Sequence, residues 1–244
     1  MTFELSSAPI VRLAWERGLG LPADSLVMGA DSGRFSHVVD NGALTFLRLW
    51  DQSVLAGPAS LLEAAAAVSD DELSEHSVML RLARDAGGRG GGTHVLYYAD
   101  DLPLHQPAGT VTVSHGNPEA VALESLCPPD DVNDVGLARL EHKFTLMGAP
   151  TEDGQEADGP VACSACAEYQ GLLAQLGTLV APAFRNQGLG LLATNIAAHE
   201  ALAAGLILQW RADVNNASAH ALAISAGFSV AGLLTQVSLQ SPHK

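Results

Sequence analysis

The chain has 244 residues, 48% of them hydrophobic and 16% charged, which is typical of a folded globular protein and too apolar for a disordered one. Its formal net charge of −15 and its 5% aromatic content argue against a nucleic-acid-binding surface. Because no run approaches the roughly 18 apolar residues of a membrane span, and the N-terminus lacks the blocks of an export signal, we expect a cytoplasmic protein that binds no membrane.

The first part of the chain, to about residue 104, predicts only scattered elements. In chain order they are strands at 43–49 and 53–56, helices at 59–68 and 70–86, and a strand at 93–99. Glycine fills most of residues 87–92. Since neither Gly-Lys-Ser/Thr nor a helix follows, we interpret this run as a flexible turn and not as a phosphate loop. A further turn at 100–103 marks the predicted domain boundary.

The remainder of the chain alternates strands and helices more regularly. Strands are expected at 110–114, 143–147, 161–169, 172–180, 206–210, 228–230 and 233–239, helices at 118–126, 130–140, 188–204 and 216–226, and an acidic loop at 149–159. This alternation predicts an α/β or α+β protein built around one twisted sheet. The predicted organisation is an N-terminal extension of unknown role, residues 1–104, followed by a domain at 105–244.

Three cysteines, Cys127, Cys163 and Cys166, do not make a disulfide framework, which fits a reducing compartment. Cys163 and Cys166 form a CxxC motif, which in other proteins serves redox chemistry at a helix start or binds zinc together with a second pair. Here the motif lies within a predicted strand and no second pair follows. We therefore interpret both as small buried strand residues, and we expect no metal site.

The segment that carries chemistry is residues 179–190. A strand ends near Pro182, a short loop follows, and Gly188 and Gly190 open a long helix. The first N–H groups of a helix have no partner within it and face the positive end of the helix dipole, so an anion such as a pyrophosphate fits there. Arg185 at the loop entrance is placed to add a charge-assisted bond. A tight connection that binds nothing is the alternative for an isolated G-x-G.

Two stretches of the sequence resemble a known family. Arg185-Asn-Gln-Gly188-Leu-Gly190, with Val180-Ala-Pro182 before it, is similar to the R/Q-x-x-G-x-G/A signature of the GNAT (GCN5-related) N-acetyltransferases. The Asn-led helix that starts at Asn216 and closes on Gly227-Phe228 resembles the second marker of that family. The resemblance spans about residues 110–239 and is strongest over 172–228. Residues before it form either a degenerate second copy of such a fold or an extension.

The resemblance implies a GNAT-type mixed sheet with two splayed parallel strands, here 172–180 and 206–210, that hold acetyl-coenzyme A as co-substrate. The pyrophosphate would lie on the amides of 185–190, and the pantetheine arm would pair with the strand at Leu179 and Val180. A neutral amine would then attack directly, and pairing of two copies is common among related folds. The expected coenzyme-binding residues are Leu179, Val180, Arg185, Asn186, Gln187, Gly188, Leu189, Gly190, Asn216 and Ser218.

The sequence departs from the family pattern at both usual proton-handling positions. Gln175 stands where the family often has a glutamate base, and Ala223 stands where it often has a tyrosine acid. The replacement candidates are Glu168, Tyr169 and His220. For Glu168 the alternative is a solvated carboxylate, and for His220 it is an ordinary helix residue.

These observations favour an acetyl-CoA-dependent N-acyltransferase that acts on a primary amine of a small molecule or peptide. The alternative from another class is a catalytically degenerate acyl-CoA-binding module with a sensing or interaction role, which Gln175 and Ala223 keep open. A nicotinamide-binding fold is disfavoured, because Ala193 occupies the third glycine position of that fingerprint.

Overall fold

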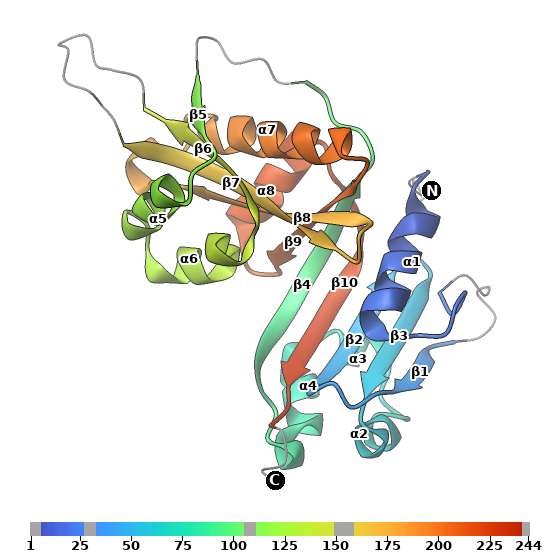
Figure 1. Ribbon diagram of the computed structural model, residues 1–244. Coiled ribbons are helices and arrows are strands. Elements are labelled where there is room, and N and C mark those ends of the chain that lie inside the picture. The colour runs from blue at the N-terminus through green and yellow to red at the C-terminus, as the bar shows by residue number, and fades with distance from the viewer. Residues whose placement is uncertain (1–5, 27–32, 105–110, 149–158, 241–244) are drawn as a thin grey trace, which may run out of the picture. The chain divides into compact units, whose positions relative to one another are not determined.

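The computed structural model describes residues 6–26, 33–104, 111–148 and 159–240 (Figure 1). The chain divides into two compact units, each described by itself below. The first comprises residues 1–97, 212–219 and 230–244, and the second comprises 98–211 and 220–229. The expected domains of 1–104 and 105–244 stay a prediction. The start of the predicted strand at residue 110 and most of the acidic loop, 149–158, lie outside the described residues.

The first unit is built on a sheet with the strand order β1-β3-β2-β10-β4. β1 pairs with β3 in parallel, whereas β2 pairs with β3 and with β10 in antiparallel fashion. The strands are β1 (Phe35–Val38), β2 (Ala43–Leu49), β3 (Gln52–Gly57), β4 (Arg89–Ala99) and β10 (Ser229–Ser238), and the helices are α1 (Ala8–Leu19), α2 (Ala59–Ala64), α3 (Asp70–Leu73), α4 (His76–Leu82) and the 3₁₀ turn Arg84–Ala86. The sequence pattern missed α1 and β1.

The predicted helix over 70–86 is interrupted. Ser69 starts α3 with a capping box, in which its hydroxyl accepts from the Glu72 amide and the Glu72 carboxylate accepts from the Ser69 amide. The Ser74 hydroxyl then donates to the Asp70 carbonyl, an arrangement that competes with continuation of the helix. Glu75 adopts an extended backbone, and α4 begins after it. Leu73 and Met79, one on each side of the break, are both fully buried.

The interpretation of residues 87–92 as a flexible turn is wrong for most of the run, because β4 begins at Arg89. Gly87 does turn the chain, with φ +68° at the end of the 3₁₀ turn. Gly91 lies within the strand at φ +79°, and a Cβ atom there would collide with the Gln236 carbonyl oxygen of β10. Its glycine is required by the close approach of two backbones and by its left-handed backbone conformation.

The two predicted closing strands are one continuous strand, β10. Ala231 and Gly232, which lie between the two predicted strands, pair with β2: the Ala231 carbonyl accepts from the Trp50 amide, and Gly232 lies opposite Leu49. A Cβ atom on Gly232 would collide with the Arg48 carbonyl oxygen. Gly232 therefore permits close pairing and does not mark a turn.

The second unit contains strands in the order β9-β8-β7-β6-β5. Pairing is antiparallel from β5 to β8, and β8 pairs with β9 in parallel. Its elements are β5 (Thr112–Ser114), α5 (Asn117–Ser125), α6 (Pro129–Val135), β6 (His142–Met147), β7 (Pro160–Tyr169), β8 (Leu173–Val180), α7 (Leu189–Ala203), β9 (Ile207–Asp213) and α8 (Ala217–Ala226), with 3₁₀ turns at Leu137–Arg139 and Pro182–Phe184. The last residues of β9 and the first turn of α8 belong to the first unit.

Alternation along the strands of the second unit separates two apolar layers. Cys163 and Leu179 point to the side of α5 and the Leu137–Arg139 turn, where they pack with Leu123. Ala162 and Val180 point to the opposite side, which α7 covers (Figure 1). The mixed α/β class predicted from the sequence is confirmed. Among the described residues, no helix combines the length and the apolar character needed to cross a bilayer.

Two neighbouring glycines of β4 test the corrected assignment. Both Gly90 and Gly91 have a left-handed backbone, but a Cβ atom on Gly90 meets nothing within 4 Å. Gly90→Ala is expected to lower the free energy of unfolding by about 1–2 kcal/mol, and Gly91→Ala by about 1–3 kcal/mol more, since it also forces two strands apart. Equal losses in urea titrations of the two variants would contradict the strand assignment.

Candidate anion-binding site at the start of α7

The site lies in the connection between the end of β8 and the start of α7. After Val180 the backbone makes the 3₁₀ turn Pro182–Phe184, and it then passes through two residues with a left-handed conformation, Asn186 at φ +61° and Gly188 at φ +78°. Gly188 directly precedes Leu189, the first residue of α7. Gly188 is exposed and a Cβ atom on it would meet nothing within 4 Å. It is therefore needed for backbone conformation, and the space beside it is open.

Six consecutive backbone N–H groups, from Asn186 to Leu191, donate no hydrogen bond to any residue that the structure describes. The first amide beyond them, that of Leu192, donates to the Gly188 carbonyl at 3.0 Å and begins the regular ladder of α7. α7 is 15 residues long, so its dipole adds a positive partial charge at the same end. A run of free amides at a helix start is an arrangement that binds phosphate or carboxylate groups.

The second glycine of the motif has a different role. A Cβ atom on Gly190 would lie 3.2 Å from Val180 Cγ2 and 3.7 Å from a methyl group of Leu222 in α8. Gly190 therefore lets the first turn of α7 pack closely on β8 and α8. The two glycines of the G-x-G motif thus serve separate purposes, conformation at Gly188 and packing at Gly190.

A chain of hydroxyl groups fixes the first turn of α7 to the sheet. Thr178 of β8 lies 2.9 Å from the Ser164 hydroxyl of β7 and 2.8 Å from the Thr194 hydroxyl of α7. Thr194 in turn donates to the Gly190 carbonyl at 2.8 Å. Ser164 and Thr194 are fully buried, where hydroxyl groups need partners. The sequence analysis missed this chain, because three small polar residues on different elements carry no pattern.

Arg185, expected to add a charge to the phosphate site, is engaged with the protein. Its Nη2 lies 2.6 Å from Asp131 Oδ2 of α6, and its Nε donates to the Val180 carbonyl at 3.2 Å. Both partners of the ion pair are about 40% exposed, and such pairs contribute about 0–1 kcal/mol. The pair is weak enough for a phosphate to compete with Asp131, so a role of Arg185 in binding stays a prediction.

The two parallel strands separate at a defined point. β8 pairs with β9 from Leu173 opposite Ile207 to Leu176 opposite Trp210, but β8 continues to Val180 with β7 as its remaining partner. The Ala181 amide donates to the Val161 carbonyl on the β7 side, and the Leu172 carbonyl accepts from the Ile207 amide on the β9 side. By alternation, the main-chain groups of Thr178 and Val180 therefore face the side from which β9 has departed. This is the splay that the resemblance implied, and it leaves an open strand edge beside the anion-binding loop.

Gln175, at the position of the missing base, is part of a polar cluster next to this point. It lies opposite Gln209 of β9, and the two side-chain amides are 2.6 Å apart. The Tyr98 hydroxyl lies 2.8 Å from the Gln209 amide. With its oxygen turned toward Arg211, Gln209 accepts from Arg211 Nε at 3.1 Å and Nη2 at 2.9 Å. Gln209 and Tyr98 are fully buried, and the sequence analysis singled out neither.

Tyr169 adjoins this cluster. The Arg211 guanidinium carbon lies 5.5 Å from the centre of the Tyr169 ring, within cation–π distance. Burial raises the pKa of the Tyr169 hydroxyl, and the Arg211 charge offsets part of that rise. Burial also lowers the pKa of Arg211. The Tyr169 hydroxyl is therefore neutral at physiological pH, and it lies on the face of the sheet that also carries Gln175.

The other expected catalytic residues lie elsewhere. Glu168 is exposed, and because side chains alternate along β7 it points to the face opposite Tyr169. His220 is half-buried in α8. A catalytic role for any of the three, Glu168, Tyr169 or His220, stays a prediction.

Asn216 and Ser218, expected to bind the coenzyme, form the cap of α8. Asn216 Oδ1 accepts from the Ala219 amide at 3.0 Å and from the Ser218 hydroxyl at 2.8 Å. This is a standard N-cap arrangement, which explains the Asn-led helix without a ligand. A coenzyme contact for either residue stays a prediction.

The CxxC motif is structural. Cys163 and Cys166 are buried strand residues, as expected, and burial raises the pKa of both thiols, that of Cys166 to about 11. Within the described ranges, no group of three or more His, Cys, Asp or Glu side chains is arranged to hold a metal ion.

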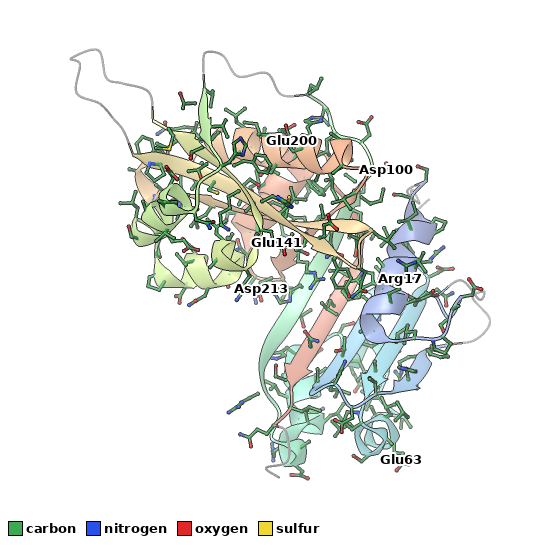
Figure 2. All side chains as sticks on the ribbon, viewed as in Figure 1. Arg17, Glu63, Asp100, Glu141, Glu200 and Asp213 are labelled. Atoms are coloured by element: carbon green, nitrogen blue, oxygen red, sulfur yellow. The ribbon has the colours of Figure 1, made fainter. Side chains whose placement is uncertain are left out.

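A surface hollow of about 650 Å³ lies in the first unit, between β1 and α2. Its polar lining consists of Ser36 and three charged side chains, Arg34, Asp70 and the exposed Glu63 of α2 that Figure 2 labels. Arg34 pairs with Asp70 at 2.8 Å, which largely balances its charge. None of the expected site residues lines this hollow, so it does not bear on the anion-binding loop.

Comparison with known proteins finds solved structures that are similar to this chain in fold. No family model and no curated protein matches the sequence. Similar solved structures include a GNAT-family protein from Novosphingobium aromaticivorans (17% identity, TM-score 0.47, 63% of this chain and 67% of that one) and an acetyltransferase of the GNAT family from Colwellia psychrerythraea (18%, 0.46, 67% and 60%). A tandem GNAT protein from the clavulanic acid biosynthesis pathway is also similar (14%, 0.46, 67% and 59%).

These identities and TM-scores concern the fold alone and say nothing about what this chain binds. The chain also spans only about 60% of the length of the last two structures. What it does must therefore be sought in its own residues.

The hydroxyl chain can be tested with a matched pair of variants. Thr178→Val keeps the shape of the side chain but removes the hydroxyl that bonds both Ser164 and Thr194, so we expect a loss of about 1–2 kcal/mol in the free energy of unfolding. Thr178→Ser retains the hydroxyl and should lose less. Urea denaturation measures both, and equal losses would show that the methyl group, not the hydrogen bonds, matters.

The thiols can be tested by alkylation. With a pKa of about 11 for Cys166, roughly one thiol in a thousand is ionised at pH 8, and burial blocks the reagent. In native protein we expect iodoacetamide to modify mainly the half-buried Cys127, and to modify all three cysteines in urea. Mass spectrometry of digests gives the sites. Rapid native labelling of Cys163 and Cys166, or a disulfide between them, would contradict a structural role.

Proposed function

We propose that this protein binds acetyl-coenzyme A in the second unit and transfers its acetyl group to the primary amine of a small molecule or peptide. The observation that carries the proposal is the run of six amides from Asn186 to Leu191, which donate to no acceptor in the described part of the chain. They lie next to the stretch of β8 from Gly177 to Val180, with which β9 no longer pairs. One feature suits a pyrophosphate and the other an extended chain of amide groups. Coenzyme A has both.

We expect the loop at 185–190 to bind the phosphates mainly through its main-chain N–H dipoles and less through charged side chains. The chain carries a net charge of −15, and Arg185 already forms an ion pair with Asp131. Amides that converge on an anion bind it without a side-chain cation. We therefore expect Gly188, whose left-handed backbone helps to present these N–H groups, to matter more for affinity than Arg185.

The open edge of β8 suits the pantetheine arm. The main-chain groups of Thr178 and the amide of Val180 face that side, so the arm can pair with them as an added strand would. The Val180 carbonyl already accepts from Arg185 Nε. Acetyl-CoA supplies an activated thioester, and the protein's contribution is to hold it beside the amine. Proximity of this kind accounts for a large part of catalysis in two-substrate reactions.

Proton handling differs from that of an enzyme with a carboxylate base. Gln175 cannot accept a proton at neutral pH, and its contacts with Gln209 and with the Leu176 carbonyl fix its position. The amine must therefore arrive neutral, so the rate should rise with pH through the pKa of the amine. Tyr169, neutral and on the same face, is the residue we propose as proton donor to the departing thiolate. As the C–N bond forms and the C–S bond breaks, the nitrogen loses one proton, which restores the Tyr169 hydroxyl.

A binding module without catalysis is the second candidate. It is favoured by the same Gln175, which is tied into a buried amide cluster, and by Ala223, which is fully buried where a proton donor would be expected. Both candidates require acetyl-CoA to bind. They differ in whether thioester is consumed when amines are added.

Thermal unfolding with and without acetyl-CoA tests the proposal. At 100 times its dissociation constant the ligand should stabilise the wild-type protein by about 2.7 kcal/mol, and Gly188→Val should abolish this shift by distorting the loop and covering its amides. The control is Gly205→Val at the other end of α7. Gly205 also has a left-handed backbone, φ +81°, with nothing within 4 Å of a Cβ atom, so its variant carries similar strain but should keep the shift.

The outcomes separate the candidates. Loss of the thioester absorbance at 232 nm with a panel of amines supports transfer, whereas binding without consumption supports the module. If acetyl-CoA does not stabilise the wild-type protein, both candidate functions are wrong. A shift that survives in Gly188→Val places the phosphates elsewhere.

A further inference from the structure

Trp210 contains a buried hydrogen-bond donor that has no acceptor in the described part of the chain. The side chain is 4% exposed, and no acceptor for its indole Nε1–H lies among the described residues. The ring packs against Phe228 with the ring centres 6.1 Å apart. Buried donors are nearly always paired in native proteins, so a buried N–H without an acceptor among the described residues is a candidate donor to a bound ligand.

The position of Trp210 indicates what that partner is. It is the last residue of β9 that pairs with β8, opposite Leu176, so it lies where the two strands part. Side-chain alternation places it on the same face as Leu176 and Thr178. α7 covers this face, because Thr178 contacts Thr194 of α7. Trp210 and the anion-binding loop therefore belong to the same side of the sheet.

The chemistry of the indole narrows the ligand group. Nε1–H only donates, and the neighbouring side chains Leu176 and Phe228 are apolar, so a charged acceptor would be poorly solvated there. A neutral carbonyl oxygen fits both conditions. Leu176, which lies opposite Trp210, is four residue steps from Val180 along β8, about 13 Å at the rise of a strand. An extended arm that starts at the loop and follows the open edge of β8 reaches this point.

We propose that Trp210 Nε1 donates a hydrogen bond to a carbonyl oxygen of the bound acyl-pantetheine arm, which makes Trp210 a ligand-binding residue at the point where β8 and β9 separate. This inference rests on the proposed function, since the ligand is acetyl-CoA. The carbonyl belongs either to an amide of the arm or to the thioester, which the experiment below distinguishes.

The direct test observes the indole proton. The chain has three tryptophans, so a ¹⁵N spectrum shows three indole N–H signals, and the Trp210→Phe variant identifies the one that belongs to Trp210. On addition of acetyl-CoA to the wild-type protein, this signal should move downfield, as a new hydrogen bond requires. An indole signal that stays in place while other resonances report binding would overturn the inference.

The affinity test compares three ligands on the same variant. Trp210→Phe removes the donor and keeps an aromatic ring against Phe228. It should weaken acetyl-CoA by about two- to tenfold, the effect of one neutral hydrogen bond, and leave adenosine 3′,5′-bisphosphate, which lacks the arm, unchanged. Equal weakening of coenzyme A assigns the bond to an amide of the arm, and weakening of acetyl-CoA alone assigns it to the thioester. Trp50→Phe in the first unit is the control and should change none of these affinities.

The results distinguish the inference from the function on which it rests. If wild-type protein does not bind acetyl-CoA, both fall. If it binds and Trp210→Phe binds equally well, only the role of Trp210 falls, and the indole is satisfied by other means. If the variant loses adenosine 3′,5′-bisphosphate as well, Trp210 supports the fold of the loop and does not contact the arm.

Discussion

The proposed site of the second unit depends on the backbone N–H groups at the start of α7, which donate to no residue in the described part of the chain. Exposed amides at a helix start are ordinarily satisfied by a cap. Here the residue before the helix is Gly188, which has no side chain to cap with. The absence of a capping side chain and the left-handed backbone at Asn186 and Gly188 keep these N–H groups turned outward, which is what makes the turn suitable for an anion.

The rigidity of that turn comes from its surroundings. The chain of hydroxyls from Ser164 through Thr178 to Thr194 ties the first turn of α7 to two strands, and Gly190 allows close packing against β8 and α8. An anion site made of main-chain dipoles is only as strong as the geometry that orients them, because each dipole contributes little alone. The supporting residues lie outside the G-x-G motif, yet the motif could not work as a binding site without them.

β8 and β9 separate after Leu176 and Trp210. The open edge of β8 begins at this point, and the polar cluster at Gln175 lies next to it. On one face the separation places Trp210 beside the α7 layer. On the other it brings together Gln175, Gln209 and Tyr98 in a buried network. In the proposed function the acyl carrier lies along the edge of β8 between these two faces, with Trp210 on one side and Gln175 and Tyr169 on the other.

The mixed α/β class, most elements after residue 111 and the strand–loop–helix turn could be predicted from the sequence, because they depend on local signals: hydrophobic periodicity, capping residues, and the order of strand, glycine and helix. Local signals failed where a glycine makes room for a neighbouring strand. Gly91 was interpreted as part of a turn and Gly232 was left outside the predicted strands, yet both lie in strands against carbonyl oxygens of residues far away in the sequence. Four features required the folded structure: the pairing of Arg185 with Asp131, the hydroxyl chain, the Gln175 cluster and the surroundings of the Trp210 indole. Each joins elements that are distant along the chain and depends on register, which no local pattern encodes.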